Sequence, residues 1–205
     1  MSSRISSLHA RQILDSRGRP TVEVDVTLED GSTGRASVPS GASTGSSEAH
    51  ELRDRDPQWF AGLGVTRAVA HVNTEIAALL QGFDAREQWD LDAALVEQDG
   101  TANLARLGAN AVLGVSLAVC RAAAASQNMA LYQWIARLSG TEDPALPMPM
   151  INILSGGLHA GRGMDVQDFL AVPIGARSRG ATQVQSWSKG RVHRWQCSPS
   201  SPASI

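Results

Sequence analysis

Cysteines and long apolar runs are scarce in this chain of 205 residues. Its two cysteines, Cys120 and Cys197, exclude a disulfide scaffold and a four-ligand zinc site, because either needs more thiols. Their scarcity favours a reducing cytoplasm. No run reaches the roughly 18 apolar residues of a membrane span, and residues 1–7 lack the apolar segment of a secretory signal. We therefore expect a cytoplasmic protein that makes no membrane contact.

Lysine is almost absent, since Lys189 is the single lysine beside 17 arginines, and no acidic residue follows Asp168. Residues 1–176 hold all 20 acidic residues and 13 of the 18 basic ones, whereas residues 177–205 hold five basic residues and no acidic one. A body with a net charge of −7 argues against a nucleic-acid-binding surface as the main function. We expect no nucleic-acid partner.

The first 39 residues show the pattern of an antiparallel meander. Apolar residues alternate with polar ones over Val22–Glu29, as is typical of a strand with one buried face. Asp30-Gly31 suits a tight hairpin turn, after which Ser32–Val38 can return as the partner strand. The segment Ile5–Leu14 supplies a third strand.

Helical patterns follow. An apolar stripe with spacings of three and four residues predicts a helix over about 65–79. Further helices are predicted over Ala85–Gln98 and Ala130–Leu138, and the many small residues of Leu107–Ala125 predict a central buried helix. The stripe consists of Val65, Val69, Val72, Ile76 and Leu79.

The character of the chain changes after the linker Thr141–Pro149, which holds three prolines. A buried strand is predicted over Pro149–Leu154, a glycine-rich loop over Gly156–Gly163 and another strand over Asp165–Val172. These features indicate the start of a second domain. From Arg177 onward the apolar residues follow neither the strand period nor the helix period. The low-complexity end of the chain is expected to be disordered.

Two loops could carry chemistry. The first brings three hydroxyls between glycines, which can offer oxygen and N–H groups to an anion or a hydrated metal ion. An ordinary surface loop remains the alternative, because small polar residues are common in loops. Its residues are Ser40, Gly41, Ala42, Ser43, Thr44 and Gly45.

The second candidate is His159, followed by Gln167 and Asp168. An imidazole, an amide and a carboxylate could converge on a polar ligand or its phosphate. A solvated loop histidine and an edge strand remain the alternative. The charged run Glu48–Asp56 is interpreted as a solvated face with local ion pairs.

Several long segments carry a family pattern, in order along about residues 1–176. They are Ala10–Gly18, Pro20–Val24, Val38–Gly45, Glu48–Asp54, Leu107–Ser116 and Pro149–Pro173. Together these segments closely resemble enolase. The resemblance implies an α+β fold, with a three-stranded antiparallel meander and helices in an N-terminal domain at 1–140. The linker and first strands of a truncated β/α barrel would occupy 141–176, and residues 177–205 would form a tail unlike the family.

The resemblance also implies a function, the magnesium-dependent dehydration of 2-phosphoglycerate to phosphoenolpyruvate in glycolysis by a homodimer. Ser43 would ligate the second Mg²⁺ ion from a mobile loop. His159 would contact the substrate phosphate region, and Gln167 and Asp168 would line the substrate pocket. His159 and Asp168 are thereby the candidate catalytic residues.

The sequence departs from the family pattern at three positions. Arg19 and Ser155 stand where the family has asparagine, and Asp168 stands where it usually has glutamate. The shorter side chain retracts the carboxylate by about 1 Å, and a misplacement of that order can cost about 10²-fold in rate.

Larger elements of the family's chemistry come from later barrel strands. There a lysine is the base, a glutamate is the proton donor, and three carboxylates hold the tightly bound Mg²⁺. Here the single lysine, Lys189, lies in the tail, and no acidic residue follows Asp168. We expect this chain alone to have no measurable dehydratase activity.

The tail is interpreted as an out-of-frame translation, because one back-translation of Trp195–Ile205, read two bases later, gives a family-like stretch. A fused tail and a natural short variant stay open as alternatives for its origin.

Two other functions of the protein also stay open. One is an inactive remnant with a dimerisation role, and the other is a polyanion binder acting through the basic tail.

Overall fold

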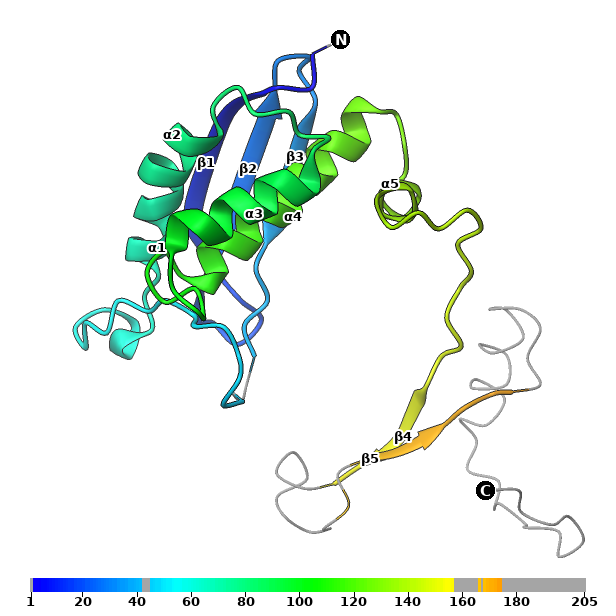
Figure 1. Ribbon diagram of the computed structural model, residues 1–205. Coiled ribbons are helices and arrows are strands. Elements are labelled where there is room, and N and C mark those ends of the chain that lie inside the picture. The colour runs from blue at the N-terminus through cyan, green and yellow to red at the C-terminus, as the bar shows by residue number, and fades with distance from the viewer. Residues whose placement is uncertain (1, 42–44, 157–165, 167, 175–205) are drawn as a thin grey trace, which may run out of the picture. The chain divides into compact units, whose positions relative to one another are not determined.

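The computed structural model describes residues 2–41, 45–156, 166 and 168–174 (Figure 1). The chain divides into two compact units, Met1–Pro144 and Ala145–Ile205, and each is described here by itself.

A three-stranded antiparallel sheet opens the first unit. Its strands are β1 (Ile5–Leu14), β2 (Pro20–Leu28) and β3 (Thr33–Ser37), in the spatial order β1-β2-β3. The predicted meander is confirmed. Gly31 has a φ of 84° in the turn between β2 and β3, a conformation that glycine adopts without strain.

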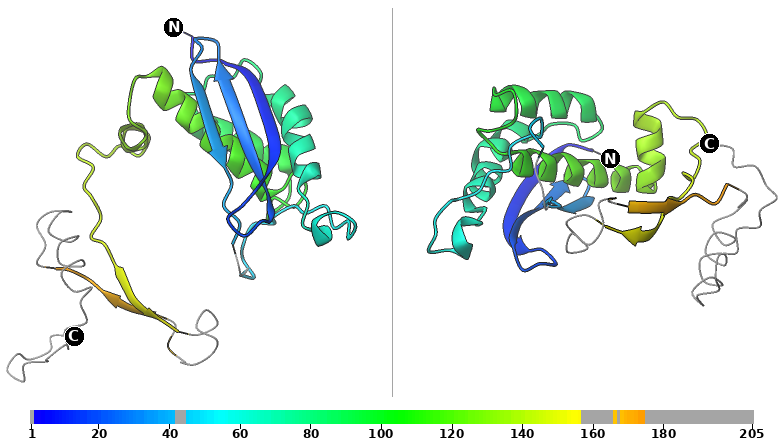
Figure 2. Two further views of the ribbon diagram at one scale, coloured as in Figure 1. Left: turned by 180° about the vertical axis from the view of Figure 1, so that it is seen from behind. Right: turned by 90° about the horizontal axis from the view of Figure 1, so that it is seen from below.

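Helices cover one face of this sheet, and Figure 2 shows it from the uncovered side. The alternating apolar residues of Val22–Leu28 are fully buried against these helices, because period-two alternation puts them all on one face. The helix α4 (Ala109–Ser126) packs across β2 and β3. Its approach is so close that a Cβ at Gly34 would lie 2.1 Å from the carbonyl oxygen of Ala118.

The helix over residues 66–80 contains a π-turn. It runs as α1 (Thr66–His71), η2 (Val72–Ile76) and α2 (Ala77–Leu80), of which η2 is π-helical. The predicted burial of Leu79 is wrong, since Leu79 is exposed and Leu80 is buried. A π-turn holds more residues than an α-turn, so the buried face moves one residue along the chain after Ile76.

The π-turn also covers the free edge of the sheet. Asn73, in η2, accepts a hydrogen bond from the backbone N–H of Ala10 at 2.6 Å and donates one to the Ala10 carbonyl at 3.0 Å. Both Ala10 groups belong to β1, the edge strand. An edge strand with unpaired backbone groups can pair with other chains. Here the side chain of Asn73 provides hydrogen-bond partners for the backbone N–H and carbonyl groups of Ala10.

The remaining helices are η1 (Phe60–Gly62), α3 (Gln88–Asp99) and α5 (Leu131–Leu138). The predicted helix over Ala85–Gln98 starts three residues late, because a turn at Asp84 precedes it. There Asp84 accepts the backbone N–H of Arg86 on Oδ1 and that of Glu87 on its carbonyl. By length and hydropathy α4 could cross a membrane, but 56% of that segment is buried inside the protein.

In the second unit, β4 (Ile151–Ser155) and β5 (Asp168–Ala171) pair antiparallel. The predicted burial of the first of these strands is wrong, since Ile153 is 63% exposed. The described residues give β4 only one partner strand and no covering layer. They form a two-stranded sheet, not a closed barrel.

Candidate functional site

The structure describes only part of the predicted site. Ser40, Gly41 and Gly45 of the hydroxyl-rich loop are described, and so is Asp168. The predictions for Ala42, Ser43, Thr44, His159 and Gln167 lie outside the described residues. The two parts of the predicted site belong to different units, so each is built separately.

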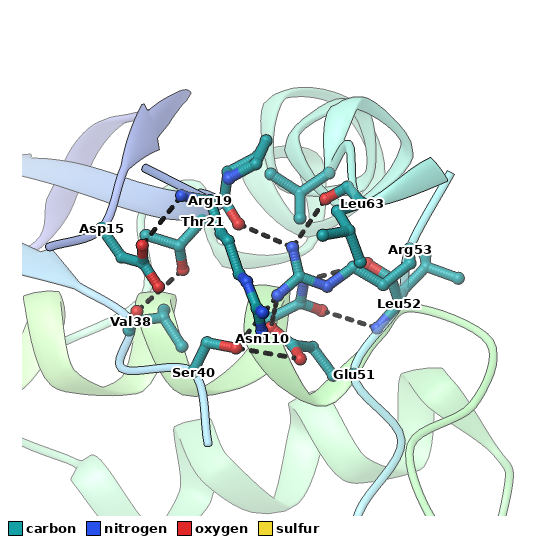
Figure 3. Close-up of polar contacts among 12 residues, drawn as sticks. Asp15, Arg19, Thr21, Val38, Ser40, Glu51, Leu52, Arg53, Leu63 and Asn110 are labelled. Carbon is teal, nitrogen blue, oxygen red and sulfur yellow. Dashed lines mark hydrogen bonds and ion pairs between the residues drawn. The ribbon is translucent and has the colours of Figure 1, made fainter. Parts of the chain in front are cut away.

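Ser40 opens the hydroxyl-rich loop and is held from two sides (Figure 3). Its hydroxyl Oγ lies 3.0 Å from Nη2 of Arg53 and 3.3 Å from Oε2 of Glu51. Its carbonyl oxygen accepts a hydrogen bond of 2.7 Å from Nη2 of Arg17. Both the side chain and the backbone of Ser40 are therefore fixed.

Arg53 is the centre of this polar cluster. Its Nη1 donates to the carbonyl oxygens of Pro20 and Leu63, each at 2.6 Å. Its Nη2 contacts Oε1 of Glu51 at 2.6 Å, and the side chain is only 14% exposed. The interpretation of this charged run as a solvated face is wrong for Arg53, because the side chain turns inward to these backbone acceptors.

The turn before β2 is organised by Asp15. Its Oδ1 accepts the backbone N–H groups of Arg17 at 2.8 Å and Arg19 at 2.9 Å. The N–H of Arg19, followed by the groups of Arg17, lowers the pKa of Asp15. Any residue except proline supplies such an N–H group. This explains how the turn accepts arginine at position 19, where the resemblance to enolase implies an asparagine.

On the far side of the loop, Asn110 holds the chain to the start of α4. Its Oδ1 accepts the N–H of Leu52, and its Nδ2 donates to the Leu52 carbonyl, both at 3.1 Å. Asn110 and Leu52 are both buried. These two bonds replace the backbone partners that an irregular segment lacks, so the segment beside Arg53 is rigidly attached to the helix.

In the second unit, three polar side chains meet at the hairpin. Oδ1 of Asp168 accepts hydrogen bonds from Nδ2 of Asn152 at 2.7 Å and from Oγ of Ser155 at 3.0 Å. Asn152 also donates to Ser155 at 2.8 Å. The pairing of β4 with β5 brings them together, since Ser155 lies opposite Asp168 in the register.

The described residues do not by themselves form a magnesium site. They contain no group of three histidine, cysteine, aspartate or glutamate side chains that could hold a metal ion. Magnesium needs near-octahedral oxygen coordination, and the described residues of the hairpin offer only the carboxylate of Asp168.

Sequence reasoning did not identify Arg53, Arg17 or Asn110 as parts of the site. Arg53 lies in a run of charged residues of both signs, and such a run gives no sign in the sequence that one of its side chains is buried. Asn110 lies inside an apolar helix, where an isolated amide is a detectable signal, because a buried polar group must find partners.

Comparison with known proteins agrees with this architecture. The family model described as the enolase N-terminal domain matches residues 5–135, and that of the enolase C-terminal TIM barrel domain matches residues 143–186. The second match extends beyond Ala176 to residue 186, and so enters the segment predicted to be unlike the family. The fold is thus an α+β domain followed by the start of a barrel domain.

The chain belongs to the enolase family. It is 60% identical over 174 residues to "Enolase" of Tropheryma whipplei (strain Twist). This alignment covers 85% of this chain and 40% of the relative. It is 55% identical over 179 residues to "Enolase 2" of Pseudomonas syringae pv. syringae (strain B728a), covering 87% of this chain and 41% of the relative. The chain therefore spans about 40% of the length of these curated relatives.

Proposed function

We propose that this chain supplies the N-terminal domain and first barrel strands of an enolase. That enzyme is a cytoplasmic glycolytic lyase (phosphopyruvate hydratase), which dehydrates 2-phosphoglycerate to phosphoenolpyruvate as a homodimer. The observation that carries the proposal is the family match, at 60% identity over 174 residues. It includes both the unit with the hydroxyl-rich loop and the hairpin with Asp168.

The proposed roles follow the resemblance residue by residue. Mg²⁺ is the proposed cofactor, and when bound it supplies positive charge beside the anionic substrate; Ser43 is the proposed loop ligand. His159 contacts the phosphate region of the substrate, and Gln167 and Asp168 line its pocket. The hydrogen bonds from Asn152 and Ser155 support the role of Asp168, because they fix the direction of its carboxylate.

The reaction removes a weakly acidic proton next to a carboxylate, and its intermediate carries added negative charge. Such a step needs a strong base and concentrated positive charge. Residues 1–205 contain one lysine, Lys189, and no acidic residue after Asp168. We therefore propose that the 205-residue polypeptide alone has no measurable turnover.

A hybrid protein tests the proposal. In the Tropheryma whipplei relative, the aligned segment is replaced by the matching 174 residues of this chain; this protein is called the hybrid enolase below. Phosphoenolpyruvate absorbance is followed for the hybrid enolase, for its His159→Ala variant and for the 205-residue chain.

We expect the hybrid enolase to be active, its His159→Ala variant to be at least about 10²-fold slower, and the 205-residue chain to give background only. An inactive hybrid that is folded would overturn the proposal for these residues. Turnover by the 205-residue chain, abolished by His159→Ala, would overturn the proposal that it is inactive alone.

A further inference from the structure

Arg53 joins three segments that are far apart in the sequence. It contacts the first residue of β2 through the Pro20 carbonyl, the segment before α1 through the Leu63 carbonyl, and the loop entrance through Ser40. Glu51, two residues before it, balances its charge at 2.6 Å. Figure 3 shows Ser40, Glu51 and Leu63 around the guanidinium group.

The position of these contacts matters because they lie on both sides of the loop. Ser40 is the first residue of the loop and Glu51 follows the loop, and the hydroxyl of Ser40 contacts both Arg53 and Glu51. The Leu52 backbone between Glu51 and Arg53 is bonded to Asn110 of α4. The entrance of the loop is thus connected, through Arg53, to the rigid helix and sheet.

Only a guanidinium fits this arrangement. It is planar and directs its N–H groups in a fixed fork, whereas a lysine ammonium is a compact charge with three donors. One terminal nitrogen of Arg53 serves two carbonyl oxygens, and the other serves a hydroxyl and a carboxylate. A lysine at this position can keep the charge near Glu51, but it cannot occupy both sets of acceptors.

We propose that Arg53 is a positioning residue that fixes Ser40 and thereby the start of the hydroxyl-rich loop. Arg17 assists by holding the Ser40 carbonyl. What the loop does once positioned rests on the proposed function. The anchoring of Ser40 itself rests only on the contacts described.

Arg53→Lys in the 205-residue chain tests the anchor. Backbone ¹⁵N order parameters of Ser40 and Gly41 are measured, with β2 residues as an internal reference. Arg35→Lys is the matched control, because Arg35 is also ion-paired, at 2.5 Å from Asp25, but lies on β3 with a 63% exposed side chain.

We expect the order parameters of Ser40 and Gly41 to fall from near the rigid value of about 0.85 to below about 0.6 in Arg53→Lys. They should stay unchanged in Arg35→Lys, and β2 should stay rigid in both. Ser40→Ala removes only the hydroxyl contact and serves if Arg53→Lys does not fold; it should lower the Gly41 value in the same direction. Unchanged values in the folded variants would overturn the proposal.

The hybrid enolase provides a kinetic measurement. Arg53→Lys should lower kcat at least tenfold while KM for 2-phosphoglycerate changes less than threefold, since the loop start is displaced without loss of a substrate contact. Arg35→Lys should leave both unchanged. If the unmodified hybrid is inactive, the proposed function fails, and the order parameters still decide the anchor. A kcat equal to that of the unmodified hybrid overturns the role of Arg53 in catalysis.

Discussion

The hydroxyl of Ser155 donates a hydrogen bond to the carboxylate of Asp168 across the β4–β5 hairpin, at 3.0 Å. These are two of the three positions at which the resemblance implies a departure from the enolase pattern. A short hydroxyl and a short carboxylate are therefore direct partners, and Asn152 donates to both. The shorter Asp168 is held by two side chains of the neighbouring strand β4.

The first prediction concerns the length of that side chain. In the hybrid enolase, Asp168→Glu restores the reach that the family usually has and should raise kcat by at least tenfold, within the roughly 10²-fold that 1 Å of misplacement can cost. Product absorbance measures the change. Asp143→Glu, in the linker segment, is the control and should have no effect. A fall in kcat with Asp168→Glu would show that the hairpin has adapted to the shorter residue.

The second prediction is an acid sensitivity at Glu75. The hydrogen bonds of Arg106, and then of Gln98, lower the pKa of Glu75 from 4.5 to about 2. Because its pKa is lower in the folded state than in the unfolded state, ionised Glu75 stabilises the fold at pH values above its unfolded-state pKa. This stabilisation is lost as the pH falls toward 2. Because the pair is partly exposed, its contribution at pH 7 is about 1 kcal/mol or less.

Urea unfolding at pH 7 and pH 3 checks this. Glu75→Gln should destabilise the protein at pH 7 by up to about 1 kcal/mol and have a smaller effect at pH 3. Glu97→Gln, at an exposed position of α3, should have little effect at either pH. An equal cost of Glu75→Gln at both values would rule out the ion pair as its source.

The third prediction concerns Gly34. An added Cβ would lie 2.1 Å from the Ala118 carbonyl oxygen and 2.4 Å from the Ala122 nitrogen, both backbone atoms of α4. Gly34→Ala should therefore cost about 2–3 kcal/mol or more, because helix and sheet must separate. Gly45→Ala is the control, since its nearest contact would be 3.6 Å, and it should cost less than about 0.5 kcal/mol. Equal unfolding midpoints for the two variants would contradict the close packing.

The fourth prediction concerns Asn110. Asn110→Ala leaves the buried N–H and carbonyl of Leu52 without partners. We expect a loss of about 2–3 kcal/mol in the free energy of unfolding. Asn103→Ala is the control, since this exposed asparagine makes no side-chain hydrogen bond to another described residue. Chemical denaturation followed by tryptophan fluorescence measures both, and a cost below 0.5 kcal/mol for Asn110→Ala would refute the role.

The fifth prediction is that residues 1–144 fold alone. The buried hydrophobic cluster extends from Ile5 to Trp134, within the first unit. A polypeptide that ends at Pro144 should show one cooperative thermal transition, with a midpoint within a few degrees of that of the 205-residue chain. Calorimetry compares the two, and a broad transition or aggregation of the shorter polypeptide would contradict this independence.

Most of the first unit could be predicted from the sequence, because its signals are local. The strand Ile5–Leu14 matches the prediction at both ends, and the alternation of Val22–Leu28 fixed which face is buried. Gly140, with a φ of 68°, follows the helix α5, a place where glycine commonly ends a helix. In each case the information lies within a few residues of the element.

The candidate site was harder to predict, because its contacts join distant segments. Arg53 bonds to residues 33 positions before it and ten positions after it. Asn110 bonds to a residue 58 positions away. No spacing rule reports such pairs. The burial of Leu80 in place of Leu79 was missed for a different reason, since an ideal helical period cannot show a single π-turn.

The π-turn at Val72–Ile76 has a consequence for how this helix tolerates changes in chain length. Removing one residue between Asn73 and Ala77 would restore an ordinary α-helical period, and Leu80 would then take the place that this period gives to residue 79 on the buried face. The two halves of the helix would keep their faces toward the core, and the change would fall on the turn from which Asn73 binds the backbone of Ala10. The extra residue therefore serves the edge of the sheet and not the core packing of the helix.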